Sequence, residues 1–323
     1  MIRDREYASS LAPHMAGLVA VKRSCGFDYS AVAYTLARLD AFCVDAGFSD
    51  GSVTVDLADA WAQAVPSEGG DSRSNRISAL RQLALYERSL GIDAYVPRGF
   101  SSRERSVAYI PTPAETRSLF AAIDAYDDDR WPYIADGYRV AFRLMRCCGM
   151  RISECAAMPV ADVDADAGTL TVRHSKGAKD RLVYMADDMT EMVESHVRGL
   201  RRTLGFWPDW LFPGKDPAKH ILKNTFCMKF AQFWRQVPGS SKRSKHPTPH
   251  SLRHAFVIDR MNRWMAEGAN LPQMMPYLSS YLGHDGPDET FYYYHQVEEA
   301  FSIVRAHDAV SARVIPEVVR YEA

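Results

Sequence analysis

The stretch TLTVRHSKGAKDRLVYM, residues 169–185, contains two short runs of strand-forming residues with a turn between them. Residues Thr169 to His174 and Asp180 to Met185 are typical of strands, and SKGAK between them is rich in small and basic residues, as a hairpin turn is. Residues 114–148 before this stretch and 187–282 after it contain several runs with apolar residues at helical spacing. The sequence therefore predicts an α+β fold that is mainly α-helical with a small antiparallel β-sheet.

Helices account for most of the remaining prediction. Apolar residues recur at helical spacing, and a glycine follows several of these runs, where a helix C-terminus favours that residue. SEGGDS, residues 67–72, has the composition of a loop. The predicted helices are Ser30–Ala46, Val55–Ala64, Arg73–Leu90, Ala114–Tyr126, Tyr133–Cys148, Asp187–Arg202, Asn224–Gln236, Ser251–Ala266 and Pro272–Leu282.

The length of the chain and one aperiodic segment predict two domains. A chain of 323 residues is long enough for two domains that each bury a core. Residues 91–113 lack helical periodicity and contain prolines and a cluster of Ser and Arg, which is typical of a linker. The predicted division is a helical domain at 1–105, a linker at 106–113 and a second domain at 114–323, with a C-terminal tail at about 297–323.

Composition excludes several classes of protein. Hydrophobic residues make up 47% and charged residues 24% of the chain, which does not fit general disorder or a fibre. The chain has no run of about 18 apolar residues and no signal-peptide pattern, and its six cysteines lack the C-x₂-C spacing of a zinc site. We therefore expect a cytoplasmic protein with reduced, mostly buried cysteines, no metal and no membrane partner.

The net charge is close to zero, but the charges are segregated along the chain. The 39 Lys and Arg against 40 Asp and Glu give −1, which argues against a polybasic nucleic-acid binder. Residues 73–105, however, contain seven arginines against three acids, whereas residues 28–71 contain eight acids against one arginine. The basic helix at 73–88 is therefore open to two interpretations, a solvated face or a DNA contact.

Four segments contain polar residues that together suit the chemistry of a phosphodiester. They are GMRISE at 149–154, HSKGAKDR at 174–181, TPHSLRH at 248–254 and YLGHDGPDETFYYYH at 281–295. Two guanidiniums can bind the non-bridging oxygens and offset the charge that develops at phosphorus, and imidazoles can transfer protons near neutral pH. A tyrosine phenol becomes a nucleophile when its proton is removed, and a lysine can protonate the leaving alkoxide.

The order of these motifs resembles the tyrosine recombinases, also called the phage integrase family. An Arg in G-x-R-x-S-E, a Lys on a β-hairpin, H-x-x-R-H, L-G-H and a Tyr nine positions after that His follow one another as in that family. The resemblance extends over nearly the whole chain. PYLSSYLGHDGPDETFYYY, residues 276–294, is most similar to integrases of bacterial transposons and other mobile elements.

The resemblance implies a site-specific DNA recombinase or integrase that cleaves and rejoins DNA through a 3′-phosphotyrosyl intermediate, for integration or excision of a mobile element. It implies that residues 1–105 are a core-binding, SAM-like DNA-binding domain and residues 114–323 the catalytic domain. The implied partners are double-stranded DNA with a specific recombination site and further copies of the chain, as a tetramer on DNA. No metal or other cofactor is implied, and the tail either packs on its own domain or docks on a neighbouring protomer.

The first catalytic residues that the resemblance implies surround the phosphate. Arg151 and Arg253 match the two arginines that clamp the phosphate, and His250 matches the neighbouring acid, base or hydrogen-bonding imidazole. Glu154, three residues after Arg151, matches an acidic position that orients the site.

The remaining matches are the residues that protonate the leaving oxygen, contact the phosphate and attack the phosphorus. Lys176 matches the hairpin lysine that protonates the leaving 5′ oxygen, and His284 matches a fourth polar contact to the phosphate. Three tyrosines are adjacent, and on a helix they would diverge by about 100° each, so one of them can face the phosphate. Counting nine residues from His284 selects Tyr293 as the nucleophile and leaves Tyr292 and Tyr294 as packing or DNA-facing neighbours.

Basic residues near these motifs are predicted to contact DNA, and two metal-like patterns are interpreted otherwise. His250 and His254 have the spacing of zinc ligands, but Ser251 stands where a zinc protease has Glu. The acidic run at 162–168 begins like a calcium loop, but its glycine comes one place late, so we expect a solvated turn. The predicted DNA contacts are Arg73, Arg76, Arg81, Lys179, Arg181, Lys242, Arg243 and Lys245.

Three alternative functions remain at this point. A type IB topoisomerase-like strand transferase would share the chemistry but rejoin the same strand. A non-catalytic DNA-binding accessory protein would be expected to have lost part of the catalytic set. A phosphodiesterase acting on RNA or protein is less consistent with the sequence, which has no metal cluster.

Overall fold

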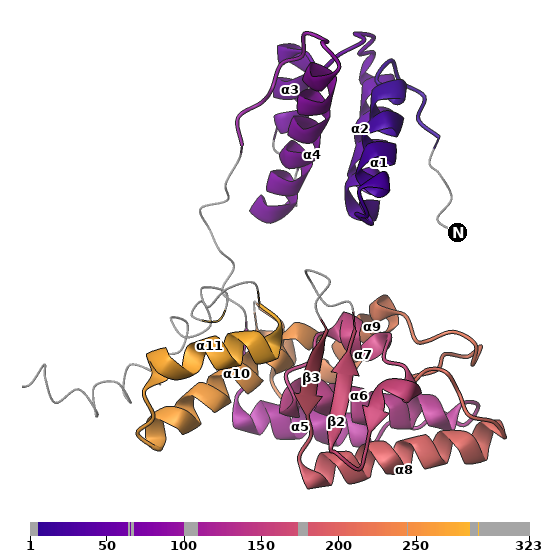
Figure 1. Ribbon diagram of the computed structural model, residues 1–323, viewed down its shortest axis with the longest axis vertical. Coiled ribbons are helices and arrows are strands. Elements are labelled where there is room, and N and C mark those ends of the chain that lie inside the picture. Colours follow the sequence, from indigo (N-terminus) through magenta and orange to yellow (C-terminus); the bar gives the residue numbers. More distant parts are fainter. Residues whose placement is uncertain are drawn as a thin grey trace, which may run out of the picture. The chain divides into compact units, whose positions relative to one another are not determined.

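The computed structural model describes residues 6–63, 65, 68–99, 109–173, 180–243, 245–284 and 290. The chain divides into two compact units, Met1–Ser106 and Val107–Ala323, which Figure 1 shows with their elements labelled. The structure is mainly helical with one three-stranded antiparallel sheet among the described residues, so the predicted fold class is confirmed. Among these residues, no helix combines the length and the apolar character that a membrane span needs.

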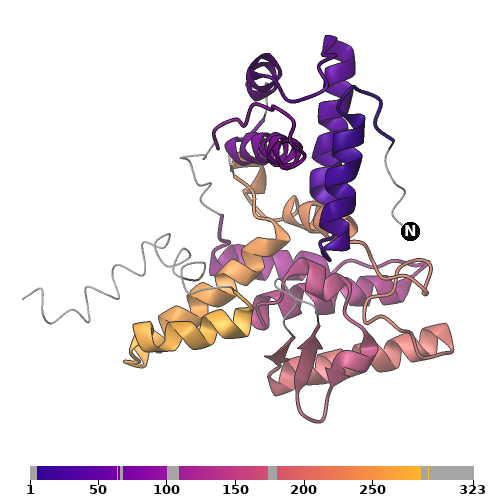
Figure 2. The same ribbon diagram turned by 45° about the horizontal axis from the view of Figure 1, so that its top comes forward.

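The first unit is a group of four helices built around the last of them. The helices are α1 (Ala12–Ser24), α2 (Ser30–Ala46), α3 (Val55–Ala62) and α4 (Gly70–Ser89), and α4 contacts each of the other three (Figures 1 and 2). Their shared core contains Met15, Leu36, Leu57, Leu80 and Leu83, all nearly inaccessible to water. Side chains at helical spacing thus bury one face of each helix.

Helix α4 begins inside the segment predicted to be a loop. SEGGDS has the composition of a loop, but the helix starts at Gly70, with Gly69 as its N-cap. Asp71 lies in the first turn, where the partial positive charge of a helix N-terminus stabilises an acidic side chain. Helix α1 is a further difference, because the periodicity predicts no helix before residue 30.

The second unit contains the sheet and seven α-helices among its described residues. Helix α6 contacts both α8 and α10, and the predicted helices agree with the observed ones to within a few residues. The elements are α5 (Pro113–Asp124), α6 (Pro132–Cys147), α7 (Ile152–Ala156), a 3₁₀ turn at Val160–Asp162, β1 (Val163–Asp164), β2 (Thr169–Val172), β3 (Arg181–Tyr184), α8 (Asp187–Leu204), α9 (Lys223–Trp234), a 3₁₀ turn at Ser240–Lys242, α10 (Pro249–Ala266) and α11 (Leu271–Leu282).

The sheet confirms the predicted pair of strands and adds a third. Strand β2 pairs antiparallel with β3, Thr169 opposite Tyr184, and β1 pairs with the other edge of β2. The strand β1 lies in the run that we expected to be a solvated turn. Asp162, just before β1, is buried and accepts a hydrogen bond from Arg173 Nε at 2.8 Å, so its charge is paired.

Aromatic side chains fill the centre of the second unit. Tyr138 and Phe142 on α6 pack at edge-to-face or tilted angles against Phe226 and Phe233 of α9, with ring centroids 5.5–6.2 Å apart. The six cysteines are free. The sequence predicts that most of them are buried, but three are, namely Cys43, Cys148 and Cys155, and the other three are exposed or half-buried.

Helices α10 and α11 form a second apolar cluster beside this core (Figure 1). Phe256 of α10 and Leu282 of α11 both approach Gly149, which follows α6 with φ +68°. A Cβ at this position would lie 2.6 Å from a Phe256 ring carbon and 3.2 Å from a Leu282 methyl group. Only glycine fits both this backbone conformation and this space.

We predict that Gly149→Ala destabilises the protein by about 2–4 kcal/mol, because a left-handed residue with a Cβ and an overpacked contact each cost about 1–2 kcal/mol. Gly205→Ala is the matched control, since Gly205 has φ +79° and no described atom lies within 4 Å of the place that a Cβ would take. Gly205→Ala should lose only the stability that the left-handed backbone conformation costs. Urea unfolding measures the free energy of unfolding of both variants. Equal losses in the two variants would contradict the steric argument.

Candidate active site

Three arginines meet at the C-terminal end of α11. Arg181, Arg253 and Arg151 donate, in that order, to the carbonyl oxygens of residues 281, 282 and 283, at 2.9, 2.7 and 2.8 Å. They come from β3, α10 and the residue before α7, which are far apart in the sequence. The end of α11 therefore assembles side chains from three separate elements.

The backbone of this helix end has a donor for every carbonyl from residue 279 to residue 283. Gly283 has φ +65°, and its N–H and that of His284 turn back to the carbonyls of Ser280 and Ser279. This is the hydrogen-bond pattern that commonly ends a helix at glycine. The next three carbonyls point onward and accept from the arginines, whose positive charge also suits the negative end of the helix dipole.

Arg151 is held by Glu154 at two points. Arg151 is the N-cap of α7; its backbone N–H donates to Glu154 Oε2 at 2.7 Å, and its Nη1 donates to Oε1 at 2.9 Å. Because Glu154 follows Arg151 by three residues in G-x-R-x-S-E, its carboxylate lies in the first turn of α7 and can reach back to Arg151 at the N-cap. The bonds from Nη1 and Nη2 use two of the five N–H donors of the guanidinium.

Glu154 also binds Arg181 in a two-point contact. Arg181 Nη1 and Nη2 donate to Oε1 and Oε2 at 2.8 and 2.7 Å, and the side chains of both residues are 8% exposed. Burial raises the pKa of the Glu154 carboxyl, but hydrogen bonds and charge from Arg181, and then from Arg151, outweigh it and hold the pKa below its ordinary value. Glu154 is therefore an anion shared by two cations.

Arg253 fixes the proton on His284. Arg253 is fully buried; its Nη1 donates to the Gly149 carbonyl at 2.6 Å, and its Nη2 lies 2.9 Å from His284 Nε2. Because a guanidinium has no acceptor, His284 Nε2 must be the unprotonated nitrogen. The proton then sits on Nδ1, which donates to Thr290 Oγ1 at 2.7 Å. His284 is thus neutral and oriented from both sides.

His250 and His254 lie one helical turn apart on α10, with ring centroids 4.4 Å apart in an edge-to-face arrangement. Burial, followed by the charges of Arg253, Arg151 and Lys223, lowers the pKa of His250 to about 4. Burial and the neighbouring His250 lower the pKa of His254 to about 3. Both imidazoles are therefore neutral near pH 7.

The structure brings five of the seven predicted catalytic residues into one neighbourhood. Arg151, Glu154, Arg253 and His284 are joined through the bonds around residues 282 and 283, and the charges of Arg151 and Arg253 act on His250. Lys176 and Tyr293 lie outside the described residues, and so does Lys179. Chemically, two guanidiniums beside a neutral imidazole can bind an anion and accept a proton next to it.

The arginines of α4 are engaged within their own unit. Arg73 and Arg76 donate to carbonyls in the segment before α4, and Arg81 donates to the carbonyl of Pro97 after it. Arg76 is 3% exposed and also pairs with Glu68 at 2.7 Å. These bonds of Arg76 do not support a DNA contact, while the DNA contacts of Arg73 and Arg81 stay predictions.

The basic residues of the second unit are placed differently from one another. Lys242 and Lys245 are exposed in the loop before α10, whereas Arg243 donates to Glu115 Oε1 at 2.9 Å with half its side chain exposed. Arg181, predicted to contact DNA, is instead buried against Glu154.

Sequence reasoning missed Lys223 and Thr290. Lys223 is the first residue of α9, is exposed, and is close enough to lower the pKa of His250. It belongs to no motif, so only the fold places it beside His250. Thr290 lies in the same sequence segment as His284, but nothing in the L-G-H motif indicates its contact with His284 Nδ1.

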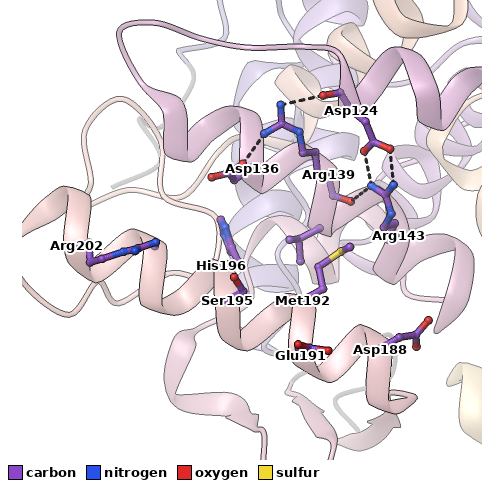
Figure 3. A pocket seen from close by; sticks show the side chains of 12 residues that line it. Asp124, Asp136, Arg139, Arg143, Asp188, Glu191, Met192, Ser195, His196 and Arg202 are labelled. Carbon is purple, nitrogen blue, oxygen red and sulfur yellow. Dashed lines mark hydrogen bonds and ion pairs between the residues drawn. The ribbon is translucent and has the colours of Figure 1, made fainter.

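A hollow of about 630 Å³ lies among α5, α6 and α8, and none of its lining residues belongs to the predicted site. Figure 3 shows the paired charges at its edge, with Arg143 bound to Asp124 and Arg139 beside Asp136. Within the described part of the chain, no three His, Cys, Asp or Glu side chains are grouped as metal ligands would be.

Comparison with known proteins identifies the family of the chain. The family model described as "Phage integrase family" matches residues 112–300, more than half of the chain. The chain belongs to the phage integrase family. It is 29% identical over 294 residues to y4rE of Sinorhizobium fredii strain NGR234, a protein named as an integrase or recombinase. The aligned residues cover 89% of this chain and 92% of y4rE.

Two further similarities concern tyrosine recombinases. The chain is 27% identical over 232 residues to the tyrosine recombinase XerD of Vibrio vulnificus, covering 71% of this chain and 70% of XerD. The Tn1549 transposon integrase, solved in complex with transposon right end DNA, has the same fold, with a TM-score of 0.63, 17% identity and coverage of 93% of this chain and 99% of that chain.

The predicted family and activity are therefore confirmed. The protein is a tyrosine recombinase, an enzyme of site-specific DNA recombination that cleaves and rejoins DNA strands through a phosphotyrosyl intermediate.

We predict that acid destabilises the protein through its two buried histidines. Each pKa is lower in the folded protein than the usual 6.5, so the unfolded chain takes up protons first, and stability present above pH 6.5 is lost as the pH falls toward 4 for His250 and 3 for His254. His254→Phe should lose about 2 kcal/mol less than wild type between pH 6.5 and 5, at about 1.4 kcal/mol per pH unit. Urea unfolding at each pH measures this, and an unchanged pH dependence would contradict it.

Proposed function

We propose that Arg151, His250, Arg253 and His284, with Lys176 and Tyr293, form the centre at which this recombinase breaks and re-forms a DNA phosphodiester. The observation that carries the proposal is the placement of two guanidiniums on the adjacent carbonyls of residues 282 and 283, beside a neutral imidazole. Two fixed cations can offset both the charge of a phosphate and the charge added in the transition state.

In the proposed reaction, the phenol oxygen of Tyr293 attacks the scissile phosphorus and the bond from phosphorus to the 5′ oxygen breaks. His250 accepts the phenol proton, and Lys176 donates a proton to the departing 5′ oxygen. The products are a 3′-phosphotyrosyl bond and a free 5′ hydroxyl. In the second half, a 5′ hydroxyl of another strand attacks the same phosphorus and Tyr293 leaves, so one phosphoester replaces another and the number of such bonds is conserved.

The charge on DNA would prepare His250 for this role. In the protein alone, Arg253 and Arg151 help to hold the His250 pKa at about 4, which makes it a weak base. A phosphate bound between these arginines adds a negative charge and so favours the protonated imidazole. His250 therefore becomes a stronger base when a phosphate is in place.

Oligomerisation and DNA contact follow from the same chemistry. Exchange between two duplexes requires the cleavage of four strands, and one nucleophile per chain then requires four protomers. We propose a tetramer on double-stranded DNA, with the first unit as a core-binding domain and the second as the catalytic domain. Lys223, Lys242 and Lys245 supply exposed positive charge to phosphates next to the site. The similarity to a transposon integrase supports a mobile element as the substrate.

We predict that Tyr293→Phe abolishes the covalent protein–DNA adduct, whereas Tyr292→Phe and Tyr294→Phe retain it, because only the residue facing the phosphate can attack it. A nicked duplex traps the adduct, since the strand released by cleavage diffuses away, and denaturing electrophoresis detects it. Loss of the adduct in a neighbouring variant, with Tyr293→Phe still active, would move the nucleophile. Exchange between two labelled duplexes distinguishes recombination from rejoining of one strand, as a topoisomerase would do.

We predict that Lys223→Ala weakens binding to all DNA sequences alike and lowers the slope of log K against log salt by about 1, as loss of one phosphate contact does. Lys219→Ala is the matched control, because Lys219 is an exposed lysine that pairs with Asp216 at 3.1 Å. Fluorescence anisotropy at several salt concentrations measures both. An unchanged slope in Lys223→Ala would place this lysine away from the DNA.

A further inference from the structure

We propose that Arg181 is a positioning residue for DNA cleavage, which leaves the Arg151 guanidinium free to act on phosphate by taking up the charge of Glu154. The inference rests on the proposed role of Arg151. Arg181 contacts Glu154 and the carbonyl of residue 281, and it is buried in the protein alone. All three nitrogens of its guanidinium group thus donate to protein oxygens, so a role as a DNA contact, suggested by its place in the sequence, is not the one that its bonds support.

Arg181 changes the charge balance around Glu154. Glu154 is one anion between two cations, and the Arg181 contact is bidentate, whereas Arg151 Nη1 makes a single side-chain bond to it. With Arg181 present, the three groups carry a net charge of +1, which is available to a phosphate at Arg151. Without Arg181, Glu154 would neutralise Arg151 alone, and the attraction of Arg151 for a second anion would fall.

Arg181 also connects separate elements. It is the first residue of β3, a strand that begins five residues after Lys176 in the sequence, and its Nε donates to the carbonyl of Tyr281, next to the carbonyls held by Arg253 and Arg151. One buried side chain thus ties the sheet to α7 and to the end of α11. Displacing reacting groups by about 1 Å can slow an enzyme about 100-fold, so such a tie can control the rate.

Arg143 provides a matched control within the same unit. It makes the same kind of two-point contact, to Asp124 at 2.8 and 2.7 Å, as Figure 3 shows, and it lies on α6 away from the three carbonyls at the end of α11. Arg143→Met therefore removes an ion pair of the same geometry, though a more exposed one, without changing a residue of the proposed site.

A DNA substrate is first selected from a randomised pool of nicked duplexes by covalent capture on the wild-type protein. The experiment then measures the single-turnover cleavage of this duplex. For Arg181→Met we expect the rate at saturating DNA to fall about tenfold or more, with the half-saturating DNA concentration within about threefold of wild type. Arg143→Met should cleave at the wild-type rate. Adding Glu154→Gln to Arg181→Met removes the uncompensated carboxylate and should restore about threefold or more of the lost rate.

A second variant covers a failure of Arg181→Met to fold. Arg181→Lys keeps the charge but not the planar fork, and should cleave at an intermediate rate with unchanged half-saturation. All rates are measured well below the unfolding temperature of each variant.

Three results would overturn the proposal. In the first, a variant cleaves at the wild-type rate at saturating DNA but binds more weakly, with a salt slope lower by about 1, which is the behaviour of a phosphate contact. In the second, the double variant is no faster than Arg181→Met. In the third, the Arg181 variants lose stability but no rate. Absence of any Tyr293-dependent adduct in the wild type would instead refute the proposed function itself.

Discussion

The site depends on how the C-terminal end of α11 satisfies its backbone. A helix ends with carbonyls that have no partner within the helix, and here three consecutive ones accept from Arg181, Arg253 and Arg151. The arginines come from β3, from α10 and from the N-cap of α7, so each reaches this position only when its own segment packs against the end of α11. The hydrogen bonds that complete the fold therefore also bring the guanidiniums together.

Concentrating positive charge in a buried place requires an anion and neutral neighbours. Glu154 supplies the anion and is itself held below its usual pKa by Arg181 and Arg151. The imidazoles stay neutral, because burial and the nearby guanidiniums oppose their protonation. The remaining positive charge can be offset by an external anion, as the phosphate would be in the proposed site.

The sequence predicts most of this architecture because its local signals agree with the final contacts. Apolar periodicity and terminal glycines locate the helices, and the strand-like runs on either side of SKGAK locate the paired strands β2 and β3. It misses β1, which consists of two residues and exists only through pairing with β2. It also misses the start of α4, where loop-like composition gives way to stabilisation of Asp71 at the helix N-terminus.

Sequence motifs predict the roles of single arginines better than local composition does. Arg151 and Arg253 are identified by motif, because neighbours at fixed spacing, such as Glu154, determine their partners. Local charge assigns the arginines of α4 and Arg181 to DNA, yet Arg76 and Arg181 are buried against carboxylates that the spacing of basic residues does not reveal. An arginine's five donors bond whichever oxygens the fold brings near. Local positive charge therefore indicates DNA contact only where the fold leaves a side chain exposed, as at Lys223 and Lys242.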